Sequence, residues 1–205
     1  AAIVTADADL NAVAYGALFG VMLNSGQACE SGTRLLVHES IYEPLLVKLA
    51  EVAGRLQVGD PMDPQTSVGP MCHAVHGQKV LDYIRSALDD GARLVCGGEQ
   101  VSVAGCEGGF FIAPTILADC HNQMNAVREE IFGPVLSVIK YRDEDEAIAI
   151  ANDSLYGLSA GIWTGDYKRA WRVARALEAG TVWINTYKQL SVAAPFGGYK
   201  LSGLG

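Results

Sequence analysis

The chain has 205 residues, of which 50% are hydrophobic and 19% charged, a composition that excludes a disordered protein and is ordinary for a globular α/β protein. A chain of this length can bury roughly 70% of its unfolded surface and so form a core of its own. The formal net charge of -8, without any Lys/Arg-rich run, argues against nucleic acid or an anionic membrane as a partner.

The N-terminus reads Ala-Ala-Ile-Val, which resembles neither a signal peptide nor a natural translation start. We therefore expect a chain cut from a longer one. The five cysteines are an odd number without any C-x-x-C pair, which predicts reduced thiols rather than a disulfide framework. Reduced thiols favour a cytoplasmic location.

The first half of the chain predicts two amphipathic helices and a strand. Asp7 is expected to cap a helix that carries apolar residues at three-to-four spacing and ends near residues 24–26. Its most apolar part, residues 12–23, is too short to span a bilayer and predicts a buried helix. Residues 31–37 predict a strand, and Ser40-x-x-Glu43 predicts a capping box for the second helix.

The second half predicts alternating strands and helices. Three prolines between residues 59 and 70 predict a loop before a helix around residues 80–88, which Gly91 ends. Asp143 and Asp166 are expected to cap later helices, the second ending at Gly180. Strands are expected at residues 93–96, 110–117, 135–141, 159–163 and 181–185. This alternation predicts one α/β domain over residues 1–205, with a layered and mostly parallel sheet flanked by helices.

Cys29 is the first candidate for chemistry. It follows the turn Gly26-Gln27-Ala28 between a predicted helix and a predicted strand, a position that can present a thiol. A free cysteine has a pKa of about 8.5, so a reactive one needs electropositive help or a base, and Glu30 opposes this. Composition alone favours a small buried hydrophobe, because free cysteines are among the most buried residues.

Gly26-Gln27-Ala28-Cys29 resembles the G-Q-x-C segment around the nucleophile of the aldehyde dehydrogenase superfamily. Residues 129–135, Glu-Glu-Ile-Phe-Gly-Pro-Val, resemble a second segment of that family. Three further resemblances follow in the family's order, at residues 59–70, 152–157 and 195–203. The resemblance covers the whole chain, which supplies well under half of a typical member. It implies the family's catalytic domain, truncated at both ends.

The resemblance also implies a role for each matching residue. Cys29 would attack an aldehyde as a thiolate, and the thiohemiacetal would pass hydride to NAD or NADP and leave a thioester for water to release as the acid. The Cys29 backbone N–H would be one donor to the oxyanion. Glu130 would hydrogen-bond the nicotinamide ribose, Phe132 would pack near the nicotinamide ring, and Phe196 would line the aldehyde tunnel. Without the resemblance, Glu130 is a solvated helix end and both phenylalanines are core residues.

Much of the family's machinery would lie outside this chain. The general base, the dinucleotide fold and the asparagine of the oxyanion hole belong to the segment upstream, and the sequence has no G-x-G-x-x-G. We therefore expect no complete NAD(P)-dependent turnover from the chain alone. The full-length protein is expected to form homodimers or homotetramers. The sequence does not decide which aldehyde is used, NAD against NADP, or release of an acid against transfer to coenzyme A.

Three alternative interpretations remain beside the dehydrogenase. A cofactor-independent thiol esterase could use Cys29, although none of the four histidines stands at a spacing that suggests a dyad. A non-enzymatic domain could keep the fold alone. Cys72 and His76, four residues apart, could share a helix face, but zinc takes three or four ligands, so we predict surface polar residues and no metal.

Overall fold

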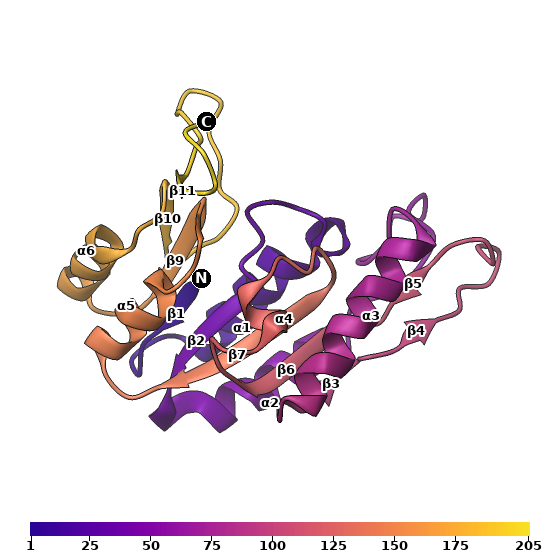
Figure 1. Cartoon of the computed structure of the whole chain (residues 1–205), viewed down its shortest axis with the longest axis horizontal. Coiled ribbons are helices and arrows are strands. Elements are labelled where there is room, and N and C mark those ends of the chain that lie inside the picture. Colours follow the sequence, from indigo (N-terminus) through magenta and orange to yellow (C-terminus); the bar gives the residue numbers. More distant parts are fainter.

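The computed structural model describes residues 1–205, and a seven-stranded sheet forms its centre (Figure 1). The strand order is β10-β9-β1-β2-β7-β6-β3, and every pairing is parallel except that of β3 with β6 at one edge. The strands are β1 (Ala2–Val4), β2 (Arg34–His38), β3 (Arg93–Cys96), β6 (Thr115–Cys120), β7 (Val135–Tyr141), β9 (Ser159–Trp163) and β10 (Thr181–Ile184). This confirms the predicted fold class.

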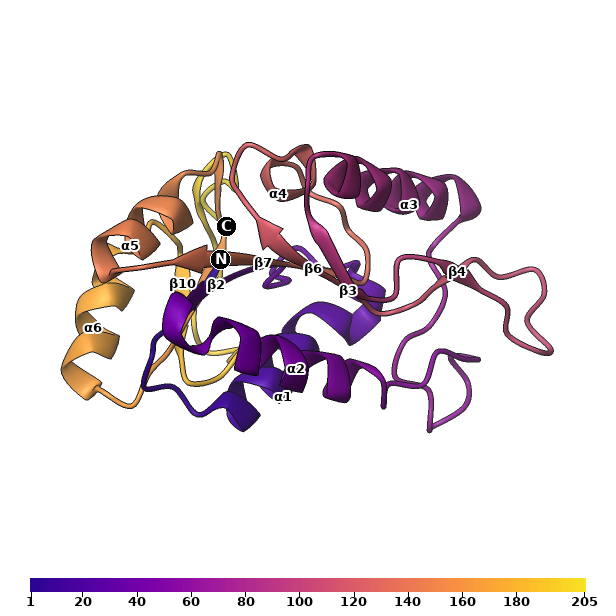
Figure 2. The same cartoon turned by 90° about the horizontal axis from the view of Figure 1, so that it is seen from below.

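Helices cover both faces of this sheet, as parallel strands require of their crossover connections. On one face lie α1 (Leu10–Met22) and α2 (Tyr42–Ala53), and on the other lie α3 (Ala74–Asp89), α4 (Asn125–Arg128) and α5 (Glu144–Asn152) (Figure 2). Helix α6 (Tyr167–Ala176) packs beside β9 and β10. Two small ribbons complete the fold, β4 (Gln100–Val101) with β5 (Phe111–Ile112) and β8 (Tyr156–Gly157) with β11 (Tyr199–Lys200).

Two apolar cores lie on the two faces of the sheet, and the central strands supply both. In β2, Leu35 and Val37 pack into the core beneath α1 and α2, while Leu36 between them packs into the core beneath α3. Because both faces are covered, the strand is apolar at every inner position instead of alternating. The structure therefore has a continuous hydrophobic run at the place where the sequence predicts a strand.

The predicted cap of the first helix is wrong by two residues. Asp9 is the N-cap of α1, and its carboxylate accepts hydrogen bonds from the backbone N–H of Asn11 at 2.8 Å and of Ala12 at 3.2 Å. Asp7 instead binds side chains from a distant part of the chain. Tertiary contacts, which local sequence does not display, therefore decide which aspartate caps the helix.

The predicted capping box at Ser40 does not form. Ser40 lies in a 3₁₀ turn, Glu39–Ile41, and its N–H donates to Nδ1 of His38 at 3.2 Å. Helix α2 then begins at Tyr42 without a side-chain cap. The imidazole does the capping because it lies at the end of β2, where it can accept from the turn that follows.

The other boundaries differ by a few residues. Helix α3 begins at Ala74, earlier than predicted, because the His73 ring accepts from the N–H of His76 at 3.1 Å and serves as its cap. The strand predicted at 110–117 divides into β5 and β6 around Pro114, which lacks an N–H for a ladder. Helix α6 ends at Ala176 rather than at Gly180. Strands 93–96, 135–141 and 159–163 are confirmed at their predicted bounds.

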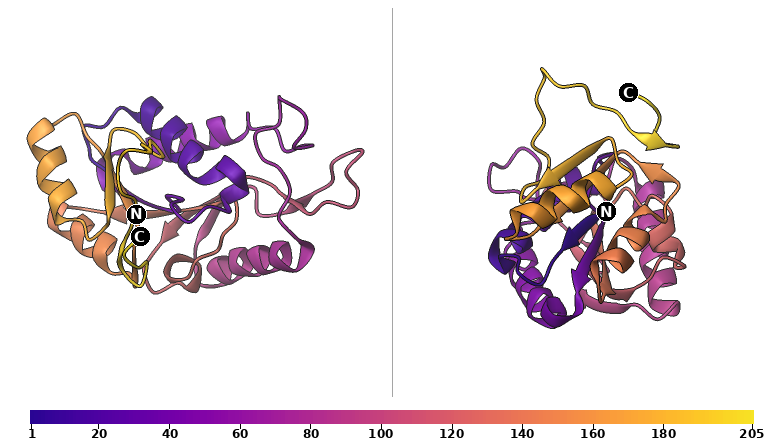
Figure 3. Two further views of the ribbon diagram at one scale, coloured as in Figure 1. Left: turned by 90° about the horizontal axis from the view of Figure 1, so that it is seen from above. Right: turned by 90° about the vertical axis from the view of Figure 1, so that its left-hand side faces the viewer.

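The chain leaves the sheet after β10. The segment that follows projects away from the body of the molecule and returns as β11, which pairs antiparallel with β8 (Figure 3). None of the helices combines the length and the apolar character needed to cross a membrane.

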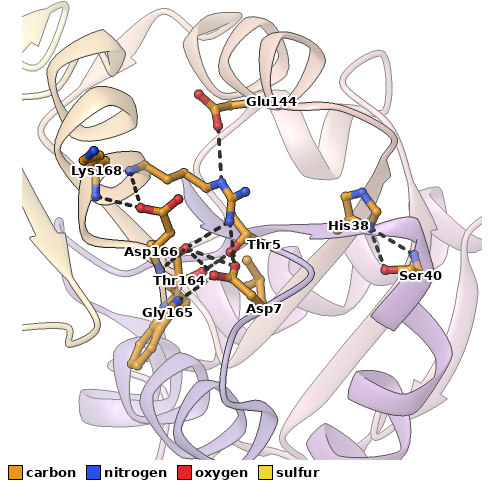
Figure 4. Close-up of polar contacts among 12 residues, drawn as sticks. Thr5, Asp7, His38, Ser40, Glu144, Thr164, Gly165, Asp166 and Lys168 are labelled. Carbon is orange, nitrogen blue, oxygen red and sulfur yellow. Dashed lines mark hydrogen bonds and ion pairs between the residues drawn. The ribbon is translucent and has the colours of Figure 1, made fainter.

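A polar network joins the carboxyl ends of β1 and β9 to α6 (Figure 4). The Asp7 carboxylate accepts hydrogen bonds from the Thr5 hydroxyl, from the Thr164 hydroxyl at 3.0 Å and from the N–H of Gly165 at 3.1 Å, and it pairs with Arg169 at 2.9 Å. Burial acts to raise the pKa of Asp7, but these hydrogen bonds and the guanidinium outweigh it and lower the pKa overall. The network fixes the N-terminal strand and α6 to each other.

Candidate functional site

Cys29 is presented by a run of left-handed backbone. Asn24, Ser25 and Gly26, at the end of the 3₁₀ turn after α1, have φ values of 55°, 56° and 73°. Only glycine fits at position 26, because a Cβ there would lie 1.9 Å from the carbonyl oxygen of Gly133. The Ser25 hydroxyl anchors the turn by donating to the Gly69 carbonyl at 2.9 Å. The thiol of Cys29 follows this fixed turn and is exposed.

A cavity of about 330 Å³ lies beside Cys29. Glu130 and Phe132 also line it, so the structure brings together three of the four predicted site residues. Part of the remaining wall comes from residues at or just before the amino ends of parallel strands, including Thr33 and Arg34 at β2 and Leu158 and Ser159 at β9. Open α/β sheets commonly bind ligands at the carboxyl ends of their strands, so this site uses the opposite end.

The segment that carries Glu130 and Phe132 is held by α3. Phe132 has a left-handed φ of 51°, and its carbonyl oxygen lies 2.7 Å from Nε2 of His76. Gly133 next to it fits closely against Val80, since a Cβ there would lie 2.6 Å from that side chain. These contacts fix the backbone while the Glu130 carboxylate makes no hydrogen bond or ion pair of its own. Burial raises the pKa of Glu130.

Phe196 does not line the cavity. It lies in the segment between β10 and β11 and is 36% exposed. The predicted role in an aldehyde tunnel stays a prediction, as do the roles predicted for Cys29, Glu130 and Phe132.

The surroundings of Cys29 disfavour its thiolate form. Burial raises the pKa of Cys29, and so does the Glu30 carboxylate, which accepts from the thiol at 3.5 Å. Backbone N–H groups of Cys29 and Glu30 act in the other direction, with a smaller effect. The opposing influence of Glu30, expected from its position in the sequence, is thus a direct contact.

Sequence reasoning missed several polar residues of this site. Arg34 and Arg128 supply cations to the cavity wall, and the hydroxyl of Ser159 donates to the carbonyl of Glu30 at 3.1 Å. Lys188 pairs with Glu30, their charged atoms 3.1 Å apart. These residues come from β2, α4, β9 and the segment after β10, and only the folded sheet brings them together. Arg34 was the one residue of this group that the sequence could have marked as a site residue, because a charge at the start of a buried strand is uncommon.

The structure places no third metal-ligating side chain beside Cys72 and His76. The ring of His76 is engaged with the carbonyl of Phe132, and the backbone N–H of Cys72 donates to Oε1 of Gln27 at 2.8 Å. Across the chain, no group of three His, Cys, Asp or Glu side chains lies close enough to hold a metal ion. All five cysteines are free thiols.

Comparison with known proteins identifies the family. The sequence matches the Aldehyde dehydrogenase family over residues 1–205. The chain belongs to the aldehyde dehydrogenase family. This confirms the resemblance seen in the segments around Cys29 and Glu130.

Similar aldehyde dehydrogenases are considerably longer than this chain. A betaine aldehyde dehydrogenase of Brucella melitensis is 47% identical over 203 residues, which are 99% of this chain and 42% of that protein. The NAD-dependent aldehyde dehydrogenase of Sinorhizobium meliloti superposes with a TM-score of 0.95 at 42% identity, covering 100% of this chain and 40% of that one. An indole-3-acetaldehyde dehydrogenase in complex with NAD+ gives a TM-score of 0.95 at 45% identity, covering 100% and 41%.

Proposed function

We propose that this chain supplies the nucleophile of an NAD-dependent aldehyde dehydrogenase that oxidises an aldehyde to a carboxylic acid. The observation that carries the proposal is the single cavity onto which Cys29, Glu130 and Phe132 all open. Cys29 is exposed there and follows a turn that its neighbours hold rigidly. Membership of the family and the NAD named for two of the solved relatives support the same assignment.

The residues of the cavity fit one end of a nicotinamide coenzyme. The Glu130 carboxylate is free to accept from ribose hydroxyls, and Phe132 offers an apolar ring beside it. When bound, the coenzyme would accept the hydride that the reaction removes. The chain has no G-x-G-x-x-G cradle for the pyrophosphate, so these residues would orient the reactive end of the coenzyme rather than hold the whole of it.

The chemistry at Cys29 follows from sulfur as the nucleophile. Its thiol loses a proton and the sulfur bonds to the aldehyde carbon, giving a thiohemiacetal. Loss of hydride from that carbon, and of the proton from its oxygen, leaves a thioester. Water then replaces the sulfur and releases the acid and the free thiol. The backbone N–H of Cys29 would donate to the oxyanion, a contact worth about 3 to 4 kcal/mol in comparable sites.

The full-length polypeptide that contains this chain provides the test. Cys29→Ala should lower the rate of aldehyde-dependent NADH formation by about a thousandfold or more, because it removes the sulfur that is proposed to form the thioester. Cys72→Ala is the matched control, since Cys72 is also exposed and should be dispensable. Activity that survives Cys29→Ala would refute the proposal.

We expect the 205-residue chain alone to react once with an aldehyde without sustaining turnover, because it lacks a general base and a complete coenzyme site. Sustained NADH production by the purified chain would contradict this. The hydrogen bonds of Cys29 run to Glu30 and to no histidine, so the thiol-esterase alternative gains no dyad from the structure. Complete inertness of Cys29 towards aldehydes would favour the non-enzymatic alternative.

A further inference from the structure

Three side chains form a continuous line that ends at the sulfur of Cys29. Nζ of Lys188 lies 3.1 Å from Oε1 of Glu30, and Oε2 of the same carboxylate lies 3.5 Å from Sγ of Cys29. The two carboxylate oxygens are therefore used separately, one by a cation and one by the thiol. A sulfur-to-oxygen distance of 3.5 Å suits an S–H donating to a carboxylate.

Both charged members of this line are sheltered from water. The side chain of Lys188 is 4% exposed and that of Glu30 is 16% exposed. The Lys188 ammonium has no well-aligned hydrogen bond with any group, so Glu30 is the compensating charge at contact distance. Charge interactions of this kind are stronger than those on a surface, because the solvent screens them less.

The backbone of Glu30 is fixed as well as its carboxylate. The Ser159 hydroxyl donates to the Glu30 carbonyl at 3.1 Å, and the buried Tyr187 hydroxyl lies 3.4 Å from that of Ser159. Tyr187 packs closely against Gly20, Gly32 and Gly161. Strand β9 and the segment after β10 thus hold Glu30 beside the sulfur.

We infer that Glu30 and Lys188 are a positioning pair that orients the S–H of Cys29 and sets how readily its proton leaves. The inference rests on the proposed role of Cys29 as the nucleophile. The two residues act with opposite sign, since the Glu30 carboxylate opposes a thiolate next to it and the Lys188 ammonium offsets that carboxylate. The charged and titratable groups that face the carboxylate are Lys188, the Cys29 thiol and the Tyr187 hydroxyl.

The pair gives the exposed sulfur a defined resting state. The Glu30 carboxylate favours the neutral thiol of Cys29 over the thiolate, and the neutral form reacts far more slowly with oxidants and alkylating agents. The cavity can therefore stay open to solvent between turnovers without losing its nucleophile. The Lys188 ammonium partly neutralises the Glu30 carboxylate, so the Cys29 thiol can still ionise during the reaction.

The test is the pH dependence of alkylation of Cys29 by iodoacetamide, followed by peptide mass mapping of the native protein. Glu30→Gln should lower the midpoint of the profile by about one pH unit, and Lys188→Met should raise it by about one unit. With the lower nucleophilicity of a more acidic thiol included, Glu30→Gln should be alkylated about threefold faster at pH 7. Cys72 in the same molecule serves as the reference thiol.

Two further variants separate charge effects from damage to the structure. In Glu30→Gln/Lys188→Met the midpoint should equal that of Glu30→Gln, because Lys188 acts through Glu30. This double variant leaves no unpaired buried charge, so a midpoint equal to that of Glu30→Gln shows that the shift comes from loss of the carboxylate and not from the Lys188 ammonium left without a partner. Glu129→Gln removes a carboxylate from the same cavity wall and should leave the midpoint unchanged.

Shifts of the two single variants in the same direction, or no shift in either, would overturn the inference. The proposed function fails separately, if aldehyde oxidation by the full-length protein survives Cys29→Ala. If Cys29→Ala abolishes oxidation while both pair variants titrate like the parent protein, only the pair is refuted.

Discussion

The two ends of the sheet are built in opposite ways. At the carboxyl ends of β1 and β9, Asp7 has hydrogen bonds and an ion pair from three segments and leaves no carboxylate oxygen unpaired. At the amino ends, Cys29 is exposed, Glu130 has no partner, and the backbone is left-handed at Asn24 and Phe132. The carboxyl end is held together by paired polar groups, whereas the amino end leaves the Glu130 carboxylate without a partner beside a cavity. Substitutions at the two ends should therefore affect different properties.

The largest loss of stability should come from the turn before Cys29. Gly26→Ala would place a Cβ 1.9 Å from the Gly133 carbonyl oxygen at a φ of 73°, so two backbone segments must separate. We expect a loss of about 3 to 4 kcal/mol in the free energy of unfolding, measured by urea denaturation.

Gly91→Ala is the matched control for this turn. Gly91 also has a positive φ, 101°, but a Cβ there meets nothing within 4 Å, so only the backbone strain of about 1 kcal/mol should appear. Equal losses in the two variants would show that the close approach of Gly26 to Gly133 does not constrain the site.

Asp7→Asn tests the opposite end. Loss of the carboxylate should lower the free energy of unfolding by about 1 to 2 kcal/mol at pH 7, a modest value because the Asp7 side chain is 40% exposed. The folded pKa of Asp7 lies below its ordinary value of 3.8, so this stability is present above that pH and is lost as the pH falls through the folded pKa. Urea denaturation at a series of pH values should show the difference between variant and parent shrinking below pH 3.8.

Asp89→Asn is the control, because Asp89 is exposed and makes no side-chain hydrogen bond or ion pair. It should change stability by less than about 0.5 kcal/mol at every pH. A pH-independent loss in Asp7→Asn would mean that its charge is not what the network uses.

His76→Ala should lower the free energy of unfolding less than Asp7→Asn does, and its effect should lie at the end of the sheet that bears the cavity. It removes the contact of 2.7 Å to the Phe132 carbonyl, for which we expect about 1 kcal/mol in urea denaturation. Amide exchange at residues 131–133 should accelerate at the same time, because the loop loses its anchor on α3. His121→Ala, which removes an exposed ring, should alter neither measurement. If amide exchange at residues 131–133 is unchanged, the contact of Gly133 with α3 is sufficient to fix this loop, and the His76 contact is not needed.

Glu130→Gln should have the smallest effect on stability, within about 0.5 kcal/mol, because the carboxylate has no partner to lose. Its effect on binding should be larger, with NAD affinity of the full-length protein about tenfold weaker in calorimetric titration. Glu129→Gln controls for charge alone, and it should weaken binding less. If Glu130→Gln lowered the free energy of unfolding and left NAD affinity unchanged, Glu130 would serve stability, as Asp7 does at the other end of the sheet.

Most of the fold could be predicted from the sequence because its signals are local. The apolar runs of β7 and β9 and the caps at Asp143 and Asp166 concern neighbouring residues, and their prediction is confirmed. The caps at Asp7 and Ser40 were wrong because other groups take the same hydrogen bonds, distant ones at Asp7 and the neighbouring His38 ring at Ser40. Asp7 is taken by Thr164 and Arg169, and the N–H of Ser40 by the ring of His38.

The candidate site was predictable only where a short motif carries it. Cys29, Glu130 and Phe132 lie in two contiguous segments, and the structure places both on one cavity. Lys188 could not be found in this way, because its partner Glu30 lies in another part of the chain and nothing beside Lys188 marks it. The end of the sheet that bears the cavity was also beyond prediction, since it depends on strand order.

The cavity's place at the amino ends of the strands also fixes which helix ends face it. Helices α5 and α6 finish there, with Ala151, Asn152, Leu177 and Glu178 on its wall, so it receives their carbonyl ends. Arg34 donates to the carbonyl of Ile150, and Asn152 to that of Ala176, which caps both helices with donors. The carbonyl end of a helix carries about half a negative charge. Here Arg34 and Asn152 offset that charge with their donors, and the cavity receives none of the free helix N-termini that favour phosphate at the usual end of a parallel sheet.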